Sequence, residues 1–289
     1  MKKKNYGFAT KTIHSGASPE AVTGARNVPI YQTTSYVFDN TEHAKRLFSL
    51  QDFGFIYSRL TNPTISALEE KVASIEKARA AVACSSGHAA QQLAFIPLLN
   101  NGDHFISSNK LYGGSINQFS KTFKSFGWHC DFVDPDDLSN FENNIRDNTK
   151  FIFIETLSNP DGAIVDIEKV SKIAKKYHIP LIVDNTLATP YLHNPIDWGA
   201  NIITHSLTKF ICGHGTSMGG IVVDCGNFDY LKDEKFPSLS KPSKSYNDIK
   251  FSETFGDFGY AMKVKADSLR DLGSTLSPQN AFNIINGLE

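Results

Sequence analysis

The sequence predicts an α/β fold in which a mostly parallel sheet carries helices on both faces. From Thr61 onward, apolar residues at helical spacing alternate with short apolar runs typical of strands. Parallel strands need helical crossovers of this kind, and such sheets are covered on both faces. The length of 289 residues allows one large domain or up to two ordinary ones, so a sizeable core is available.

The first half of the chain begins this alternation with a helix over residues 61–78, "TNPTISALEEKVASIEKA". Pro63 lies just inside a capped start, and apolar residues follow on one helical face. The next predicted elements are the strand 80–84, the turn and helix 85–99, the strand 104–108, a helix carrying Ile116, Phe119, Phe123 and Phe126, and the strand 128–134.

The second half continues the pattern. Its predicted elements are a helix with Leu138, Phe141 and Ile145, the strand 150–156, a helix with Ile167, Val170, Ile173 and Tyr177, and the strands 179–185, 201–205 and 219–224. The last two strands bracket the segment "SLTKFICGHGTSM". A final helix is predicted from Ser277 as cap and Pro278 in the first turn, with Ala281, Phe282, Ile284, Ile285 and Leu288 on its buried side.

We expect three parts: an irregular arm over 1–60, a large domain over 61–260, and the start of a further domain over 261–289. Residues 232–257, rich in Ser, Lys and Pro, are predicted to be exposed. The apolar side of the final helix has no predicted partner in the sequence, so we expect residue 289 to be a truncation point.

Composition points to a small-molecule partner. The 29 basic and 30 acidic residues give a net charge of −1, without the long charged runs typical of nucleic-acid or membrane surfaces. No apolar signal core or membrane-spanning stretch is present. The four cysteines form no CxxC pair, which indicates reduced thiols and a cytoplasmic protein.

Polar residues gather where the predicted strands end, and these ends meet at one edge of a parallel sheet, where ligands collect. They are Ser85, Ser86, Gly87 and His88; Tyr112, Gly113 and Gly114; Ser158 and Asn159; Asp184 and Asn185; and Ser206, Thr208 and Lys209. Each has an ordinary structural interpretation as well. Ser86 can cap a helix, Asp184 can close a turn, Tyr112 can pack at a turn, and Lys209 can be a solvated lysine.

Pyridoxal phosphate would use the whole group. Its aldehyde needs an amine such as that of Lys209, and its phosphate needs hydroxyls and backbone amides. A carboxylate such as that of Asp184 would keep the ring nitrogen protonated, which makes the ring an electron sink for the carbanion formed at the substrate α-carbon. A flat residue such as Tyr112 would cover the ring.

Six motifs, in order, resemble the pyridoxal-phosphate enzymes of cysteine and methionine metabolism, the cystathionine γ-synthase-like family. They are "YSRLTNPT", "SSGHAA", "LYGG", "ETLSNP", "VDNTLATPYL" and "HSLTKFICGHG". The resemblance runs from about residue 10 to the end. It implies the aspartate-aminotransferase fold, fold type I. Within the family, "LRDLGSTLSPQNAFNIINGLE" resembles the O-acetylhomoserine sulfhydrylases most.

The resemblance implies a role for each matching position. Lys209 is the Schiff-base lysine and proton carrier, Asp184 pairs with the ring nitrogen, and Tyr112 stacks on the ring. The implied cofactor ligands are Ser86, Gly87, His88, Tyr112, Asn159, Asp184, Thr186, Ser206, Thr208 and Lys209, with Tyr57 and Arg59 reaching the phosphate of a neighbouring subunit. His88 stands where many relatives carry Met or Gln, so only its backbone role transfers.

The implied reaction converts O-acetylhomoserine and sulfide to homocysteine and acetate, in a homo-oligomer built as a dimer of active dimers. A methionine γ-lyase and a cystathionine γ-synthase or lyase remain alternatives. The family's substrate-carboxylate arginine has no counterpart after Arg270. We therefore also consider an inactive cofactor-binding fragment, and expect slower turnover than in a version that carries the further domain.

Three other functions fit the sequence less well. Residues 215–219 match the hydrolase pattern G-x-S-x-G, which must lead from a strand into a helix, whereas here a predicted strand follows. The same stretch lacks the third glycine and the helix of a dinucleotide site, because Met218 stands in the glycine position. His205, Cys212 and His214 lack a recognised metal-ligand spacing, so we predict no metal.

Overall fold

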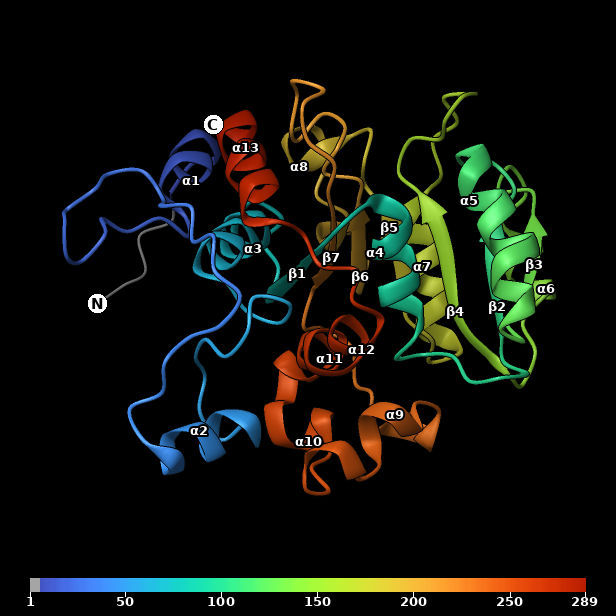
Figure 1. Cartoon of the computed structure of the whole chain (residues 1–289). Coiled ribbons are helices and arrows are strands. Elements are labelled where there is room, and N and C mark those ends of the chain that lie inside the picture. Colours follow the sequence, from blue (N-terminus) through green and yellow to red (C-terminus); the bar gives the residue numbers. More distant parts are fainter. Residues whose placement is uncertain (1–5) are drawn as a thin grey trace.

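A computed structural model describes residues 6–289 and contains a seven-stranded sheet. Its strands are β1 (Ala80–Cys84), β2 (His104–Ser108), β3 (His129–Val133), β4 (Thr149–Glu155), β5 (Leu181–Asp184), β6 (Ile202–His205) and β7 (Gly220–Asp224). Their order is β1-β7-β6-β5-β4-β2-β3, and β7 alone runs opposite to the other strands of the sheet (Figure 1). The predicted mostly parallel sheet is confirmed.

Helices connect the strands and extend the chain at both ends. They are α1 (Phe8–His14), α2 (Thr41–Phe48), α3 (Pro63–Ile75), α4 (Gly87–Phe95), α5 (Gly113–Asn117), α6 (Ser139–Asn143), α7 (Ile167–Lys176), α8 (Thr189–Leu192), α9 (Pro237–Ser240), α10 (Phe251–Phe255), α11 (Gly259–Lys263), α12 (Arg270–Leu272) and α13 (Pro278–Leu288). Two π-helical segments, η1 (Gln118–Phe123) and η6 (Val264–Leu269), and four 3₁₀-helical segments complete the helical structure: η2 (Pro195–Trp198), η3 (Lys232–Glu234), η4 (Lys244–Tyr246) and η5 (Gly256–Phe258). No helix within residues 6–289 has the length and apolar character to cross a bilayer.

Side-chain caps start the helices that frame the sheet. The side chain of Asn62 accepts the amide of Thr64 at the start of α3, and Ser86 accepts the amide of Ala89 at the start of α4. Ser277 caps α13 in the same way, as the sequence predicts. These caps satisfy amides that have no partner within the helix, so each helix begins at a defined residue, and α4 begins directly after β1.

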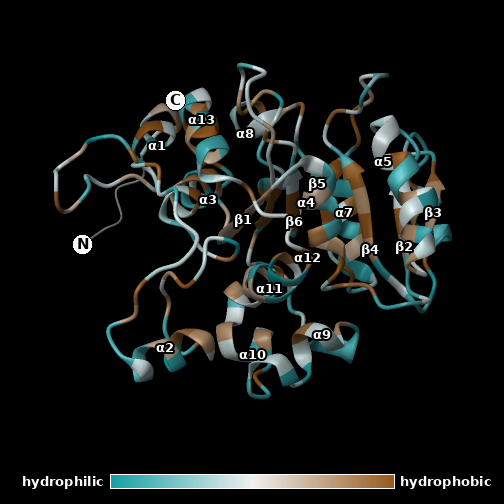
Figure 2. Cartoon of the chain, viewed as in Figure 1, coloured by the Kyte–Doolittle hydropathy of each residue, from teal (hydrophilic) through white to brown (hydrophobic). Residues whose placement is uncertain are grey.

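Alternating residues of each strand feed two separate cores, one on each face of the sheet. In β4, Ile152 and Ile154 face the core beneath α3, α7 and α13, whereas Phe151 and Phe153 face the core beneath α4, η1 and α11. Figure 2 shows the central strands as a continuous apolar band between helices of mixed polarity. The predicted cover on both faces is confirmed.

Two expectations about burial were wrong. Ile284 and Ile285 of α13 are fully buried, because α13 packs against α3, and Figure 1 shows it beside α1 and α3. The cover therefore comes from helices more than 200 residues earlier in the chain. Residues 232–257 are not uniformly exposed either, because Phe236 and Phe251 are buried in the core beneath α4, η1 and α11.

Replacing Phe95 would measure how much the core beneath α4, η1 and α11 contributes to stability. Its ring lies 4.5–5.6 Å from the rings of five other phenylalanines, centroid to centroid. Truncation leaves a cavity that these rigid neighbours cannot fill, so Phe95→Ala should lower the free energy of unfolding by about 3–5 kcal/mol. Phe126→Ala, at a ring that is 44% exposed, should cost about 1 kcal/mol or less. Denaturant unfolding of both variants measures this, and equal losses would contradict the assignment.

Candidate active site

Five strands deliver the predicted site residues to one edge of the sheet. The strands β2, β4, β5 and β6 are parallel, and β1 shares their direction because both β1 and β6 run antiparallel to β7. Their carboxyl ends therefore lie together, at the top of Figure 1. The residues that this edge collects are Ser86, Gly87 and His88 after β1, Tyr112 after β2, Asn159 after β4, Asp184 and Thr186 at the end of β5, and Ser206, Thr208 and Lys209 after β6.

Asp184 is the last residue of β5 and is only 8% exposed. One carboxylate oxygen accepts the amide of Thr186 at 3.0 Å, and the other accepts the hydroxyl of Thr204 at 3.0 Å. The hydroxyl oxygen of Thr186 in turn accepts the amide of Ser206 at 2.8 Å. These bonds fix the carboxylate and tie the end of β5 to the turn that leads to Lys209.

Lys209 lies in a tight turn after β6, with its side chain exposed. Its amide donates to the carbonyl of Ser206 at 3.2 Å, and its carbonyl accepts the amide of Gly213 at 2.9 Å. The Thr208 hydroxyl oxygen accepts the amide of Gly219 at 3.0 Å, which closes the loop between β6 and β7. The backbone of the turn is thus fixed on both sides while the amine of Lys209 stays free to react.

Two glycines, Gly87 and Gly220, let the turn after β1 approach its neighbours closely. A Cβ atom at Gly87 would lie 2.7 Å from the Cβ of Ser206, and one at Gly220 would lie 1.9 Å from the carbonyl oxygen of Ser86. Glycine at both positions therefore brings the start of α4 against the turn before Lys209. The hydroxyl of Ser86 caps α4, which is the structural role that the sequence also allowed for it. The amides of Gly87 and His88 lie in the first turn of the helix.

The ring of Tyr112 lies at the mouth of this edge and is 50% exposed. It lies 5.9 Å from the ring of His88, centroid to centroid. A Cβ atom at Gly114 would fall 2.4 Å from the Tyr112 ring and 2.9 Å from His88, so glycine there leaves room for both rings. The pair forms an aromatic wall beside the start of α4.

Glu155, the last residue of β4, is a candidate site residue that the sequence analysis missed. It is 5% exposed and lies beside Asp184 in the sheet register. One of its oxygens accepts the amide of Tyr112 at 2.9 Å, and the other accepts the amide of Asn159 at 3.3 Å. Burial, and then the negative charge of Asp184, raise the pKa of Glu155 to about 8. A glutamate that ends an apolar strand was the signal available in "ETLSNP".

A third buried carboxylate, Glu76, lies at the end of α3. Its Oε1 atom lies 2.6 Å from Nε2 of His205 and accepts the side-chain amide of Asn185 at 3.0 Å, and its Oε2 atom accepts that of Asn194 at 3.2 Å. The Asn185 side-chain oxygen also accepts the hydroxyl of Thr156 at 2.9 Å. This network joins the ends of β4, β5 and β6, and nothing local in the sequence marks Glu76 for it.

Tyr57 and Arg59 lie on the arm and contact α12 and the segment that follows it. The Arg59 guanidinium carbon lies 5.4 Å from the centre of the Tyr57 ring, and the guanidinium donates to the carbonyl of Arg270 at 2.6 Å. The carbonyl of Arg59 accepts the hydroxyl of Thr275 at 3.1 Å. The pair thus belongs to the arm and to the segment after α12, and its predicted role in a neighbouring subunit remains a prediction.

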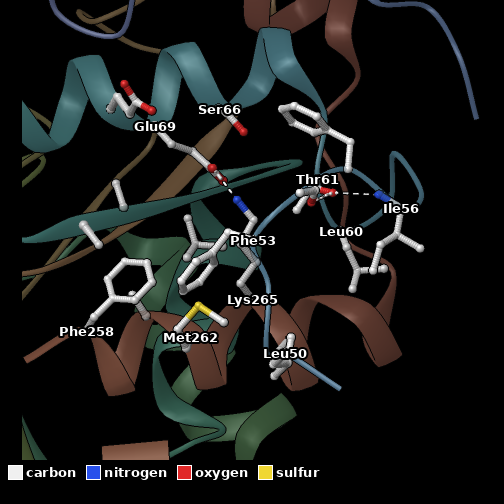
Figure 3. Close-up of a pocket in the computed structure, with 18 of the residues that line it drawn as sticks. Leu50, Phe53, Ile56, Leu60, Thr61, Ser66, Glu69, Phe258, Met262 and Lys265 are labelled. Atoms are coloured by element: carbon white, nitrogen blue, oxygen red, sulfur yellow. Dashed lines mark hydrogen bonds and ion pairs between the residues drawn. The ribbon is translucent and has the colours of Figure 1, made fainter. Parts of the chain in front are cut away.

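A cavity of about 560 Å³ lies elsewhere, between the arm, α3, β1 and η6. Figure 3 shows its mainly apolar lining, with Phe53, Met262 and Phe258 around the ion pair of Glu69 and Lys265. None of the predicted site residues lines it. Within residues 6–289, no cluster of three or more His, Cys, Asp or Glu side chains could hold a metal ion.

The family comparison gives this geometry a context. Residues 9–289 match the family model described as Cys/Met metabolism PLP-dependent enzyme. The chain belongs to this family. The donors at the strand ends suit the family's cofactor, because a buried carboxylate, a free amine and a glycine-lined helix start lie at one edge.

Individual relatives agree with this membership. An O-acetyl-L-homoserine sulfhydrylase of Leptospira meyeri is 45% identical over 99% of the chain, which spans 66% of that relative. A Campylobacter jejuni crystal structure, described as a candidate O-acetylhomoserine (thiol)-lyase carrying a pyridoxyl-lysine phosphate, superposes with a TM-score of 0.95. The two sequences are 40% identical, and the match covers 98% of this chain and 70% of the Campylobacter jejuni chain. A cystathionine gamma-lyase structure of Lactobacillus plantarum superposes with a TM-score of 0.78 at 32% identity. That match covers 98% of this chain and 63% of the Lactobacillus plantarum chain.

The raised pKa of Glu155 predicts a pH dependence of stability. Its folded value of about 8 lies above its ordinary value of 4.5, so the folded protein binds this proton more tightly than the unfolded chain does. The stability that this provides is complete below pH 4.5 and is lost as the pH rises toward 8. Urea unfolding of the cofactor-free chain across this range should show a decline in stability that is shallower in Glu155→Gln. Parallel pH profiles of the two proteins would contradict this pKa.

Proposed function

We propose that this chain is the cofactor-binding part of a pyridoxal-phosphate enzyme that converts O-acetylhomoserine and sulfide to homocysteine and acetate. The observation that carries the proposal is the buried Asp184 carboxylate, which Thr186 and Ser206 link to the turn that presents Lys209. The names and folds of the relatives support the same reaction. The phosphate would lie at the start of α4, with Ser206 and Thr208 nearby.

In this proposal each residue has a separate task at the edge of the sheet. Asp184 would hold a proton on the ring nitrogen, because an anion in a buried site favours a cationic neighbour. Lys209 would bind the cofactor covalently through its amine, and the same amine is the group proposed to carry protons between the α- and β-carbons of the substrate. Tyr112 would cover the ring from the mouth of the site, and Asn159 would approach the phenolic oxygen.

The chemistry fits a γ-replacement. Bound pyridoxal phosphate supplies an electron sink for the charge left when the α-proton is removed. To expel acetate from the γ-carbon, a base must then remove a β-proton, and Lys209 on its short turn is the amine proposed for both transfers. Sulfide adds at the γ-carbon in place of acetate, and the protons return to the β- and α-carbons. Atoms and charge balance as O-acetylhomoserine plus the hydrosulfide ion giving homocysteine plus acetate.

We also propose a homo-oligomer, built as a dimer of active dimers, in which Tyr57 and Arg59 of one subunit reach the phosphate of another. Both residues lie on the arm, and Tyr57 is substantially exposed. The four cysteines are all unpaired, which supports the proposed cytoplasmic location.

The covalent role of Lys209 has a direct test. Borohydride reduction of the cofactor-loaded chain, followed by peptide mapping, should place the label on Lys209. Lys209→Ala should lose both the label and the yellow absorbance. Lys110→Ala, at a lysine near the same edge that pairs with Asp136, should retain both. A label on any other lysine would exclude the assignment.

Substrate choice is tested by comparing two reactions of the same protein. O-acetylhomoserine with sulfide should yield homocysteine and acetate, and methionine alone should yield far less product. Ammonia and α-ketobutyrate as dominant products would indicate a γ-lyase instead. Tight cofactor binding without turnover of either substrate would support the fragment alternative.

A further inference from the structure

We propose that Glu155 is a positioning residue whose carboxylate holds the backbones of Tyr112 and Asn159, so that both side chains are presented to the cofactor ring. This inference rests on the proposed function, because Tyr112 and Asn159 are the residues proposed to contact the ring. It adds an assignment that the six motifs did not make, namely a single side chain that couples two loops of the site.

The contacts connect loops from two adjacent strands. Tyr112 follows β2, Asn159 follows β4, and one carboxylate accepts one amide from each, at 2.9 and 3.3 Å. The second loop is a closed turn in its own right, since the amide of Ser158 donates to Ala163 and that of Gly162 donates to Ser158. Moving the Glu155 carboxylate would therefore shift two separate loops together.

Fixing the backbone of Tyr112 also limits its ring. The residue lies immediately before α5, and its amide donates to the Glu155 carboxylate at 2.9 Å. The ring itself lies between His88 and Gly114, where even one added Cβ atom would collide with it. The residue is half exposed and its ring meets these neighbours on one side, so a displaced amide would change how the ring meets them.

Two acceptor oxygens are needed at position 155, because the neighbouring Asp184 uses both of its own oxygens elsewhere. Glu155 and Asp184 are partners in the register of two parallel strands, and Asp184 uses its own oxygens on Thr186 and Thr204. An amide side chain has only one acceptor oxygen, so Gln at position 155 would leave one of the two backbone amides facing another donor. A cation bound at Asp184 would offset the repulsion between the two acids and strengthen the charge-assisted bonds of Glu155.

The chain offers a matched control in Asp224. This buried carboxylate also accepts two backbone amides, from Gly226 at 2.9 Å and Ala261 at 3.0 Å. Burial raises its pKa as well, to about 7. It ends β7, which runs the opposite way, so it lies at the far edge of the sheet from Lys209. Asp224→Asn therefore removes the same kind of interaction without touching the candidate site.

The experiment compares the unsubstituted chain with Glu155→Gln, Glu155→Asp and Asp224→Asn. Pyridoxal phosphate is titrated into each protein after removal of bound cofactor, and visible circular dichroism per bound cofactor reports the orientation of the ring. Both Glu155 variants should weaken binding about tenfold and change the dichroism, because Asp keeps the charge but is one methylene too short to reach both amides. Asp224→Asn should lower the melting temperature without either change.

Several outcomes would overturn the role of Glu155. Wild-type affinity and dichroism in Glu155→Gln would show that the two bonds are dispensable. Full rescue by Glu155→Asp would show that charge acts rather than geometry, and equal losses in Asp224→Asn would show a general effect of stability. Failure of the unsubstituted chain to bind the cofactor would instead contradict the proposed function.

Amide hydrogen exchange of the unsubstituted, cofactor-loaded chain gives a test that does not depend on any variant folding. The amides of Tyr112 and Asn159 should exchange slowly, as expected for donors bonded to a buried carboxylate. The neighbouring amide of Gly113, for which no such acceptor is present among the described residues, serves as the comparison. Fast exchange at either Tyr112 or Asn159 would overturn the proposal.

Discussion

A single buried carboxylate, that of Glu76, sets the spacing of the strand ends on which the candidate site depends. It interacts with His205, Asn185 and Asn194, and Asn185 is bonded in turn to Thr156. The ends of three neighbouring strands are therefore joined next to the residues proposed to face the cofactor. A buried charge that lost its partners would be strongly destabilising, so this arrangement can hold only when all the strand ends are in place.

Close contacts between backbone segments also fix the geometry of the candidate site, in addition to the side-chain network of Glu76. Glycine at positions 87 and 220 lets the start of α4 lie against the turn before Lys209, and a methyl group at either position would collide with Ser206 or Ser86. The aromatic core around Phe95 holds α4 from the other side. The reactive amine is thus exposed on a turn whose surroundings are fixed by packing.

Sequence reasoning predicted the features that repeat along the chain or follow from strand direction. The strands, the caps at Ser86 and Ser277 and the gathering of Asp184 and Lys209 at one edge are of this kind. It missed Glu155 and Glu76, because their partners lie 43 and 129 residues away and only the folded chain brings them together. The packing of α13 against α3 was missed for the same reason. Gly287 of α13 gives a further example, because an added Cβ atom there would collide with the carbonyl of Cys212, and no local pattern reveals this contact.

The central claim is that this edge of the sheet holds pyridoxal phosphate between Lys209 and Asp184. A crystal structure of the chain grown with the cofactor tests it most directly. The account predicts electron density continuous with the Nζ atom of Lys209, the ring nitrogen within hydrogen-bond distance of Asp184, and the phosphate at the start of α4. Cofactor density joined to another lysine, or a ring whose nitrogen faces away from Asp184, would contradict the account.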